Sequence, residues 1–129
     1  MSVQLDHLMV PSRDKEAAAA RLAGLLGVPW GPAAAGPFVA VYVSDSLTLD
    51  FDEWAEPMPA LHYCFRVDPA EFDAILGRIR AAGIPFRSRV HGPADGRVDA
   101  DHGGRIVYWN DPDGHQWEML TVSYARQPG

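Results

Sequence analysis

The chain has 129 residues, of which 47% are hydrophobic, and a formal net charge of −6. This composition predicts one folded domain and disfavours nucleic-acid binding, which needs a basic face, and binding to an anionic membrane surface. With a single cysteine, no signal-peptide pattern and no apolar run of roughly 18 residues, we expect a cytoplasmic protein without a disulfide or a membrane span.

The first half of the chain reads as a strand, a helix and two further strands. Alternating apolar positions predict the strands, and alanine-rich filling that ends at Gly27 predicts the helix. A connector that includes a short edge strand separates the helix from the later strands. We therefore expect a strand at 3–10, a helix at 12–26, a connector at 28–32 and a strand pair at 38–43 and 47–51.

The second half repeats this order after a proline-containing linker at 53–60. Asp68, Pro69 and Glu71 form a strong helix start, since they suit the cap, the first turn and a capping box. A long loop then separates a single strand from a final hairpin, whose turn is Asp111-Pro112-Asp113-Gly114. We expect strands at 61–67, 85–90, 105–109 and 116–122, a helix from 69 to about 82, a loop at 91–103 and a tail at 123–129.

Two similar segments point to an internal repeat. Gly27-Val28-Pro29-Trp30 and Gly83-Ile84-Pro85-Phe86 lie 56 residues apart, and His7 precedes His62 by 55 residues. We predict an α+β fold of two tandem βαβββ modules, residues 1–56 and 61–123, within a single domain over 1–129. Together the modules would form an incompletely closed, eight-stranded, barrel-like cavity.

Polar side chains occupy the strand faces that the helices would leave uncovered. His7, His62 and Glu118 each lie within an apolar strand, on the face opposite to its apolar neighbours. Two imidazoles and one carboxylate suit Fe, Mn, Co, Ni or Zn, and three ligands leave positions open for a substrate. The alternative is that such histidines are core residues whose ring nitrogens are satisfied by hydrogen bonds.

Three motifs give the chain a resemblance to the vicinal oxygen chelate superfamily, the group of glyoxalase I, bleomycin-resistance proteins and extradiol dioxygenases. They are Leu5-Asp6-His7-Leu8, Leu61-His62-Tyr63-Cys64-Phe65 and the segment from Asp111 to Glu118. The resemblance implies one divalent metal per site, held by His7, His62 and Glu118. It also implies a small-molecule substrate and a homodimer in which modules are exchanged between chains.

The same resemblance adds three residues to the candidate site, Asp50, Tyr108 and His102. Asp50 corresponds to a further ligand of glyoxalase I, or else lies at the sheet rim. Tyr108 corresponds to a tyrosine of fosfomycin-inactivating enzymes, or else belongs to the core. Met9 stands where those enzymes carry a threonine, which disfavours that activity. From the loop, either His91 or His102 could reach the metal as a general acid or base. His102, with Tyr108 and Glu118, completes the candidate catalytic set.

Other polar residues carry weaker signals. We expect His115, in the hairpin turn, to be exposed. Arg66, Arg89 and Arg105 are candidates for holding a substrate carboxylate or phosphate. Trp117 alternates away from Glu118 and should lie under the helix.

Two functions remain open. The first is a divalent-metal-dependent enzyme, a glyoxalase-like lyase or isomerase or a dioxygenase, acting on a small oxygen-chelating metabolite. The second is a metal-free drug- or metabolite-binding protein similar to bleomycin-resistance proteins. Because those relatives generally lack the metal triad, the set of His7, His62 and Glu118 favours the enzyme.

Overall fold

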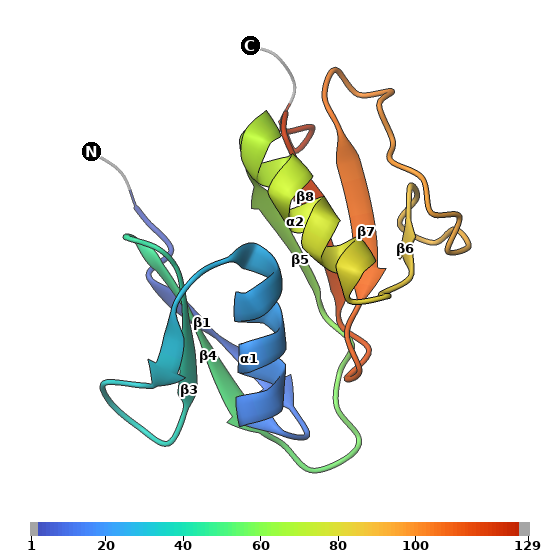
Figure 1. The fold of residues 1–129 in the computed structure, drawn as a ribbon. Coiled ribbons are helices and arrows are strands. Elements are labelled where there is room, and N and C mark those ends of the chain that lie inside the picture. The colour runs from blue at the N-terminus through green and yellow to red at the C-terminus, as the bar shows by residue number, and fades with distance from the viewer. Residues whose placement is uncertain (1–2, 127–129) are drawn as a thin grey trace. The chain divides into compact units, whose positions relative to one another are not determined.

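The computed structural model describes residues 3–126 and divides into two compact units, one ending at Pro59 and the other beginning at Ala60 (Figure 1). Each unit contains one helix and one four-stranded sheet. The α+β class with two βαβββ modules is therefore confirmed. Neither sheet closes on itself within the described residues, and the barrel-like cavity stays a prediction. No helix in this part of the chain is long and apolar enough to cross a membrane.

The first strand of the first unit, β1, pairs in parallel with β4, the last strand of this unit along the chain. The sheet order is β1-β4-β3-β2. The elements are β1 (His7–Ser12), α1 (Lys15–Leu26), β2 (Trp30–Pro32), β3 (Val39–Ser44) and β4 (Leu47–Glu53).

The first strand and helix both start later than the sequence predicts. Ser12 still belongs to β1, where its hydroxyl donates to the Asp52 carbonyl oxygen at 2.9 Å. The helix cap is consequently Asp14, whose carboxylate accepts from the Ala17 amide at 3.1 Å. A side chain with a cross-strand partner thus extends the strand at the expense of the helix.

The two faces of the first sheet differ sharply in burial. On one face, the apolar strand residues are buried. Helix α1 lies against β3 and β4, and its apolar residues are buried as well. The opposite face carries His7, Met9 and Tyr42, and Met9 and Tyr42 are 41% and 39% exposed. The buried strand residues are Val10, Val39, Val41, Leu49 and Phe51.

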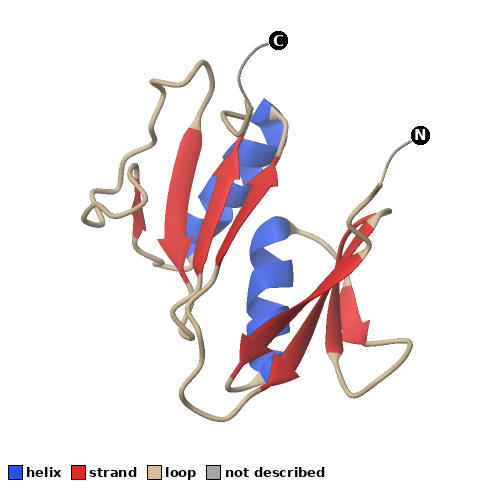
Figure 2. Ribbon diagram, turned by 180° about the vertical axis from the view of Figure 1, so that it is seen from behind, coloured by secondary structure: helices blue, strands red, loops and turns tan. Residues whose placement is uncertain are grey.

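The second unit repeats this plan, with sheet order β5-β8-β7-β6 and a parallel pair formed by β5 and β8. Figure 1 shows α2 lying across one face of this sheet, and from behind the strands lie in front of α2 (Figure 2). The elements are β5 (His62–Arg66), α2 (Pro69–Ala81), β6 (Phe86–Arg87), β7 (Ile106–Asn110) and β8 (Gln116–Leu120).

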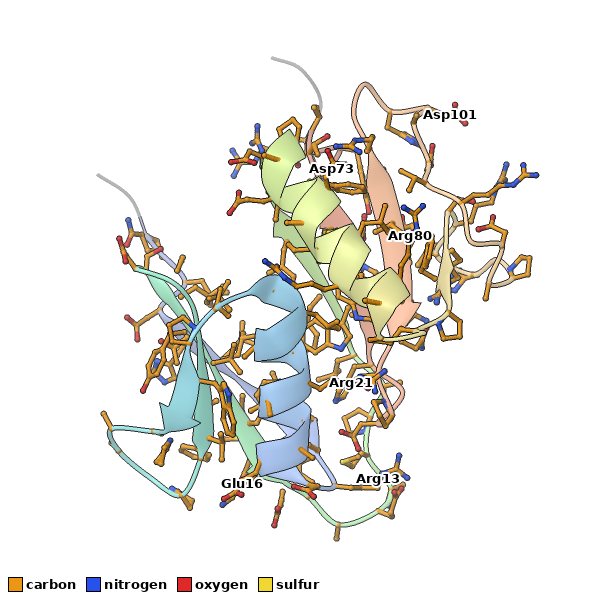
Figure 3. The ribbon with its side chains drawn as sticks, viewed as in Figure 1. Arg13, Glu16, Arg21, Asp73, Arg80 and Asp101 are labelled. Carbon is orange, nitrogen blue, oxygen red and sulfur yellow. The ribbon has the colours of Figure 1, made fainter. Side chains whose placement is uncertain are left out.

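The predicted start of α2 is confirmed in full. Asp68 accepts from the Glu71 amide at 2.8 Å, and Glu71 accepts in return from the Asp68 amide at 3.0 Å. The helix buries Phe72, Ile75, Leu76 and Ile79, which recur at helical spacing. On its exposed side, Asp73 pairs with Arg105 at 2.6 Å (Figure 3).

The strand predicted at 85–90 is much shorter than expected. It covers only Phe86 and Arg87, because the chain leaves the sheet at Ser88. The Ser88 amide donates to the Asp95 carboxylate at 3.1 Å, and the Ser88 hydroxyl donates to the same group. These contacts replace ladder hydrogen bonds and fold residues 88–97 into a compact loop. Asp101 lies further along, at the outer end of the segment that leads to β7 (Figure 3).

Candidate metal centre

The two units place their polar side chains at the same register positions. In the first unit His7 pairs with Thr48 and Met9 with Asp50. In the second, His62 pairs with Gln116 and Cys64 with Glu118. Asp50 is therefore the structural counterpart of Glu118, one methylene shorter. Each unit presents one imidazole and one carboxylate on one face of its parallel strand pair.

In the second unit this pair forms a direct contact. The Nε2 atom of His62 lies 2.9 Å from Oε1 of Glu118, whose side chain is fully buried. The other carboxylate oxygen, Oε2, accepts a hydrogen bond from the Tyr124 hydroxyl at 2.7 Å. On the far side of the imidazole, Nδ1 lies 3.4 Å from Oε1 of Gln116. Both ring nitrogens of His62 are thus held by side chains of β8.

The surroundings of Glu118 favour a cation. Within residues 3–126 its ion-pair partner is the His62 imidazole, and no lysine or arginine pairs with it. Desolvation, with the Glu118 charge nearby, raises the pKa of the Cys64 thiol to about 12. Burial of a carboxylate without a permanent positive partner is costly, and a divalent ion bound by Oε1 and Nε2 would supply the missing charge. The donor set therefore fits such an ion.

The first unit holds its histidine differently. The His7 side chain is 63% exposed, and its Nδ1 lies 2.7 Å from the Asp6 carboxylate. The hydrogen bond to Asp6, with the charge of Asp50 adding, raises the pKa of His7. With Nδ1 donating to Asp6, the Nε2 lone pair is available, which is the common arrangement for a metal-ligating histidine. A surface hollow of about 480 Å³ in this unit is lined by residues that include His7, Thr48 and Asp50.

A larger hollow of about 670 Å³ lies in the second unit, between the loop after β6 and Tyr108. Tyr108 is buried on β7, opposite Glu118 in the ladder, and desolvation raises the pKa of its phenol. His102 also lines the hollow and pairs with Asp99 at 3.3 Å. The His102 ring lies 6.0 Å from the Tyr124 ring. The hollow therefore borders Tyr108, which lies opposite Glu118 in the ladder. It also borders His102, whose ring lies near that of Tyr124, the hydrogen-bond donor to Glu118.

Comparisons with known proteins agree on one group. No protein-family profile matches the chain. The solved structure of oxidase ChaP-H2 is 38% identical, with a TM-score of 0.90 over 97% of this chain and 98% of that one. Oxidase ChaP-H1 is 40% identical, with a TM-score of 0.88 over 97% and 100%. The chain belongs to the vicinal oxygen chelate superfamily.

More distant members of this superfamily share the fold. A glyoxalase/dioxygenase from Nostoc punctiforme has a TM-score of 0.70 at 22% identity, over 93% of this chain and 91% of that one. The fosfomycin resistance protein FosX from Mesorhizobium japonicum is 33% identical over 60 residues, 46% of this chain. The matched segment spans only 38% of that relative's length.

The structure brings together some of the residues expected from the superfamily and leaves others in separate units. His62, Glu118 and Tyr108 share one face of the second sheet, whereas His7 and Asp50 lie in the first unit. Within residues 3–126, no group of three or more His, Cys, Asp and Glu side chains gathers around a single point. The complete triad therefore stays a prediction.

The expectation that His115 is exposed is wrong. Its side chain is fully buried, and Nδ1 accepts a hydrogen bond from the Leu61 amide at 3.0 Å. Asp111 draws the chain inward, since its carboxylate accepts from the amides of Asp113 and His115 and from Trp117. His115 therefore joins the hairpin to the start of β5.

Two residues differ from the sequence analysis: Arg105, named there as a candidate for binding a substrate anion, and Tyr124, which it does not name. The Arg105 guanidinium pairs with Asp73 and stacks on Phe72 at 4.4 Å, so it is occupied by the α2 surface. Tyr124 follows the last strand, in a segment that the sequence suggests is only a tail. Its contact with Glu118 depends on tertiary folding and leaves no mark in the local pattern. The tail residues 127–129 lie outside the described part of the chain.

Proposed function

We propose that this protein is a divalent-metal-dependent enzyme acting on a small oxygen-chelating metabolite, by glyoxalase-like lyase or isomerase chemistry or as a dioxygenase. The observation that carries this proposal is the fully buried Glu118 carboxylate in contact with Nε2 of His62. A drug-binding protein needs a pocket but gains nothing from a buried acid at this position. Relatives named as oxidases and as a glyoxalase/dioxygenase support the same choice.

The proposed ligands are His62 and Glu118 of the second unit and His7 of the first unit, from the same chain or from a second copy. Asp50, the register counterpart of Glu118, is the candidate for a further ligand. The ion would be Fe, Mn, Co, Ni or Zn, and when bound it would polarise a substrate oxygen as a Lewis acid.

The chain's own residues prepare the ligands and handle protons. With Gln116 and Asp6 accepting from the Nδ1 atoms of His62 and His7, each Nε2 would present its lone pair to the metal. In His62 the metal would take the place of the proton now shared between Nε2 and Oε1 of Glu118. Tyr108, at the wall of the larger hollow, can donate its phenol proton to a substrate oxygen. His102, paired with Asp99, is the candidate for proton exchange at the loop side of the hollow.

The larger hollow suits a small substrate in size and in chemistry. Its volume of about 670 Å³ lies within the range of small-molecule sites. Apolar walls come from Val90 and Val98, while Arg89 offers a guanidinium for a substrate carboxylate or phosphate. A substrate seated there would contact Tyr108, which neighbours Glu118 in the ladder.

We also propose a cytoplasmic homodimer in which modules are exchanged. The uncovered face of the first sheet carries Met9 and Tyr42, both well exposed. Apolar side chains on an open sheet face gain stability when a second surface covers them. A partner that covers this face would also lie over His7 and Asp50.

The proposal is tested by metal analysis combined with turnover. The purified protein should bind about one divalent ion per chain, and His62→Ala should remove most of the affinity. Glu118→Gln should lower turnover on the order of 10²-fold, with a much smaller effect on thermal stability. The matched control is His91→Ala, which changes an exposed loop histidine that is not among the residues lining the larger hollow. This variant should change neither the metal affinity nor the turnover.

Two outcomes would contradict the proposal that the protein is a metal-dependent enzyme. One is absence of metal after reconstitution near neutral pH. The other is full turnover by Glu118→Gln. Binding of a drug-sized ligand by metal-free protein, without any turnover, would favour the binding-protein alternative.

A further inference from the structure

The Tyr124 hydroxyl makes the shortest hydrogen bond to the Glu118 carboxylate. It donates to Oε2 at 2.7 Å, whereas Oε1 faces Nε2 of His62 at 2.9 Å. The two carboxylate oxygens therefore have different tasks. Oε1 points at the imidazole nitrogen that would share a metal with it, and Oε2 is occupied by the phenol.

The segment that carries Tyr124 is anchored rather than loosely attached. The Thr121 amide donates to the Arg105 carbonyl oxygen at 3.0 Å, and the Thr121 hydroxyl accepts from the Arg105 amide at 2.9 Å. Gly104 packs beneath this turn so closely that an added Cβ would lie 2.5 Å from the Thr121 hydroxyl and 2.8 Å from Val122. The chain is thereby returned toward β8, where Tyr124 reaches Glu118.

We propose that Tyr124 is a positioning residue for the metal ligand Glu118, an inference that rests on the proposed function. By donating to Oε2, Tyr124 fixes the carboxylate plane and directs Oε1 toward the metal, so that Glu118 binds through one oxygen. Without the phenol, Oε2 would lose this hydrogen bond, and it could turn to the metal as a second donor.

Monodentate binding by Glu118 has a chemical consequence. A carboxylate that binds through both oxygens takes two coordination positions, and one that binds through Oε1 alone takes one. Tyr124 would therefore leave one further position on the ion for a substrate oxygen. The same hydrogen bond withdraws charge from the carboxylate, which would make an ion held by Oε1 a stronger Lewis acid.

The test compares Tyr124→Phe with Tyr63→Phe in the full-length protein, using Co²⁺ as the probe. Tyr63 is the matched control because its hydroxyl, also in the second unit, is buried without a hydrogen-bond partner among the described residues. Co²⁺ affinity is measured by competition titration, and the visible absorption of bound Co²⁺ reports its coordination number.

Tyr124→Phe should lower the intensity of the visible bands, as expected when a second carboxylate oxygen enters the coordination sphere, and should not weaken Co²⁺ binding, because the carboxylate regains charge and adds a donor. Tyr63→Phe should change neither the bands nor the affinity. Gly104→Ala, which displaces the anchored turn but keeps the phenol, should change the spectrum in the same direction as Tyr124→Phe.

The outcomes separate this inference from the proposed function. A native spectrum in Tyr124→Phe would overturn the positioning role while leaving the metal site intact. A native protein that binds no Co²⁺ would overturn both. Equal losses of band intensity in Tyr124→Phe and Tyr63→Phe would show a general effect of hydroxyl removal and would also overturn the inference.

Discussion

Cys64 on β5 stands directly opposite Glu118 on β8 in the parallel ladder. Its thiol is accordingly held near a buried carboxylate, and its pKa is raised from 9.0 to about 12. The arrangement disfavours Cys64 as a nucleophile, since the thiolate is the reactive form. It also makes the cysteine a reporter of charge at the candidate metal centre.

We therefore expect Cys64 of the metal-free protein to react with iodoacetamide at pH 8 on the order of 10²-fold more slowly than a free cysteine. Glu118→Gln should speed the reaction, because it removes the neighbouring negative charge. Mass spectrometry of the alkylated protein over time measures both rates. A native rate equal to that of a cysteine peptide would contradict the proposed environment of the thiol.

Tyr63 offers a prediction about stability. Its ring stacks on Trp117 at a centroid distance of 4.6 Å, but its buried hydroxyl lacks a partner within residues 3–126. Tyr63→Phe keeps the stacking and removes the unsatisfied group, so it should stabilise the protein by about 1 kcal/mol. Thermal denaturation should show a rise of about 3–6 °C in Tm. A fall in Tm would mean that the hydroxyl has a stabilising partner in solution.

The loop after β6 should depend on the ionisation of Asp95. Its hydrogen bond from Ser88 lowers the pKa of Asp95, so the stabilising contribution is complete above the unfolded value of 3.8. It should be lost as the pH falls through the lower, folded value. Hydrogen exchange of residues 88–97 should therefore stay slow down to about pH 3.8 and accelerate below it.

Asp95→Ala should produce the fast exchange of this loop already at neutral pH. Helix α2, which does not contact Asp95 through any hydrogen bond found in residues 3–126, is the internal control and should exchange as in the native protein. Unchanged protection of residues 88–97 in the variant would show that Asp95 does not hold the loop.

The exposed side chains of Met9 and Tyr42 on the first sheet lead to a prediction about the oligomeric state. Light scattering at micromolar concentration should give twice the monomer mass. Tyr42→Glu, which places a charge on that face, should shift the protein toward monomer, whereas Glu16→Lys at the start of α1 should not. A monomer mass for the native protein would exclude exchanged modules.

The parts of the fold that depend on neighbours in sequence were predictable. The capping box of Asp68 and Glu71 involves residues three apart, and strand alternation combined with the repeated module plan predicted one face for His62 and Glu118. The errors arose where distant residues decide the structure. Ser88 leaves the sheet for Asp95, and His115 turns inward to accept from the Leu61 amide.

The candidate site divides in the same way. The residue types and strand faces of the candidate ligands follow from the strand pattern, but the hydrogen-bond partner of each side-chain atom does not. The hydrogen bond from Tyr124 to Oε2 of Glu118 depends on the anchored turn at Thr121. The periodicity of the sequence does not predict this turn.

The link between the two units has a practical consequence. None of residues 53–60 is buried, and each unit has its own core on either side of them. A protease should therefore cut at residues 54–60, which follow β4, before it reaches either sheet. The same segment is where the chain can accept an inserted reporter peptide, or be opened to create new ends.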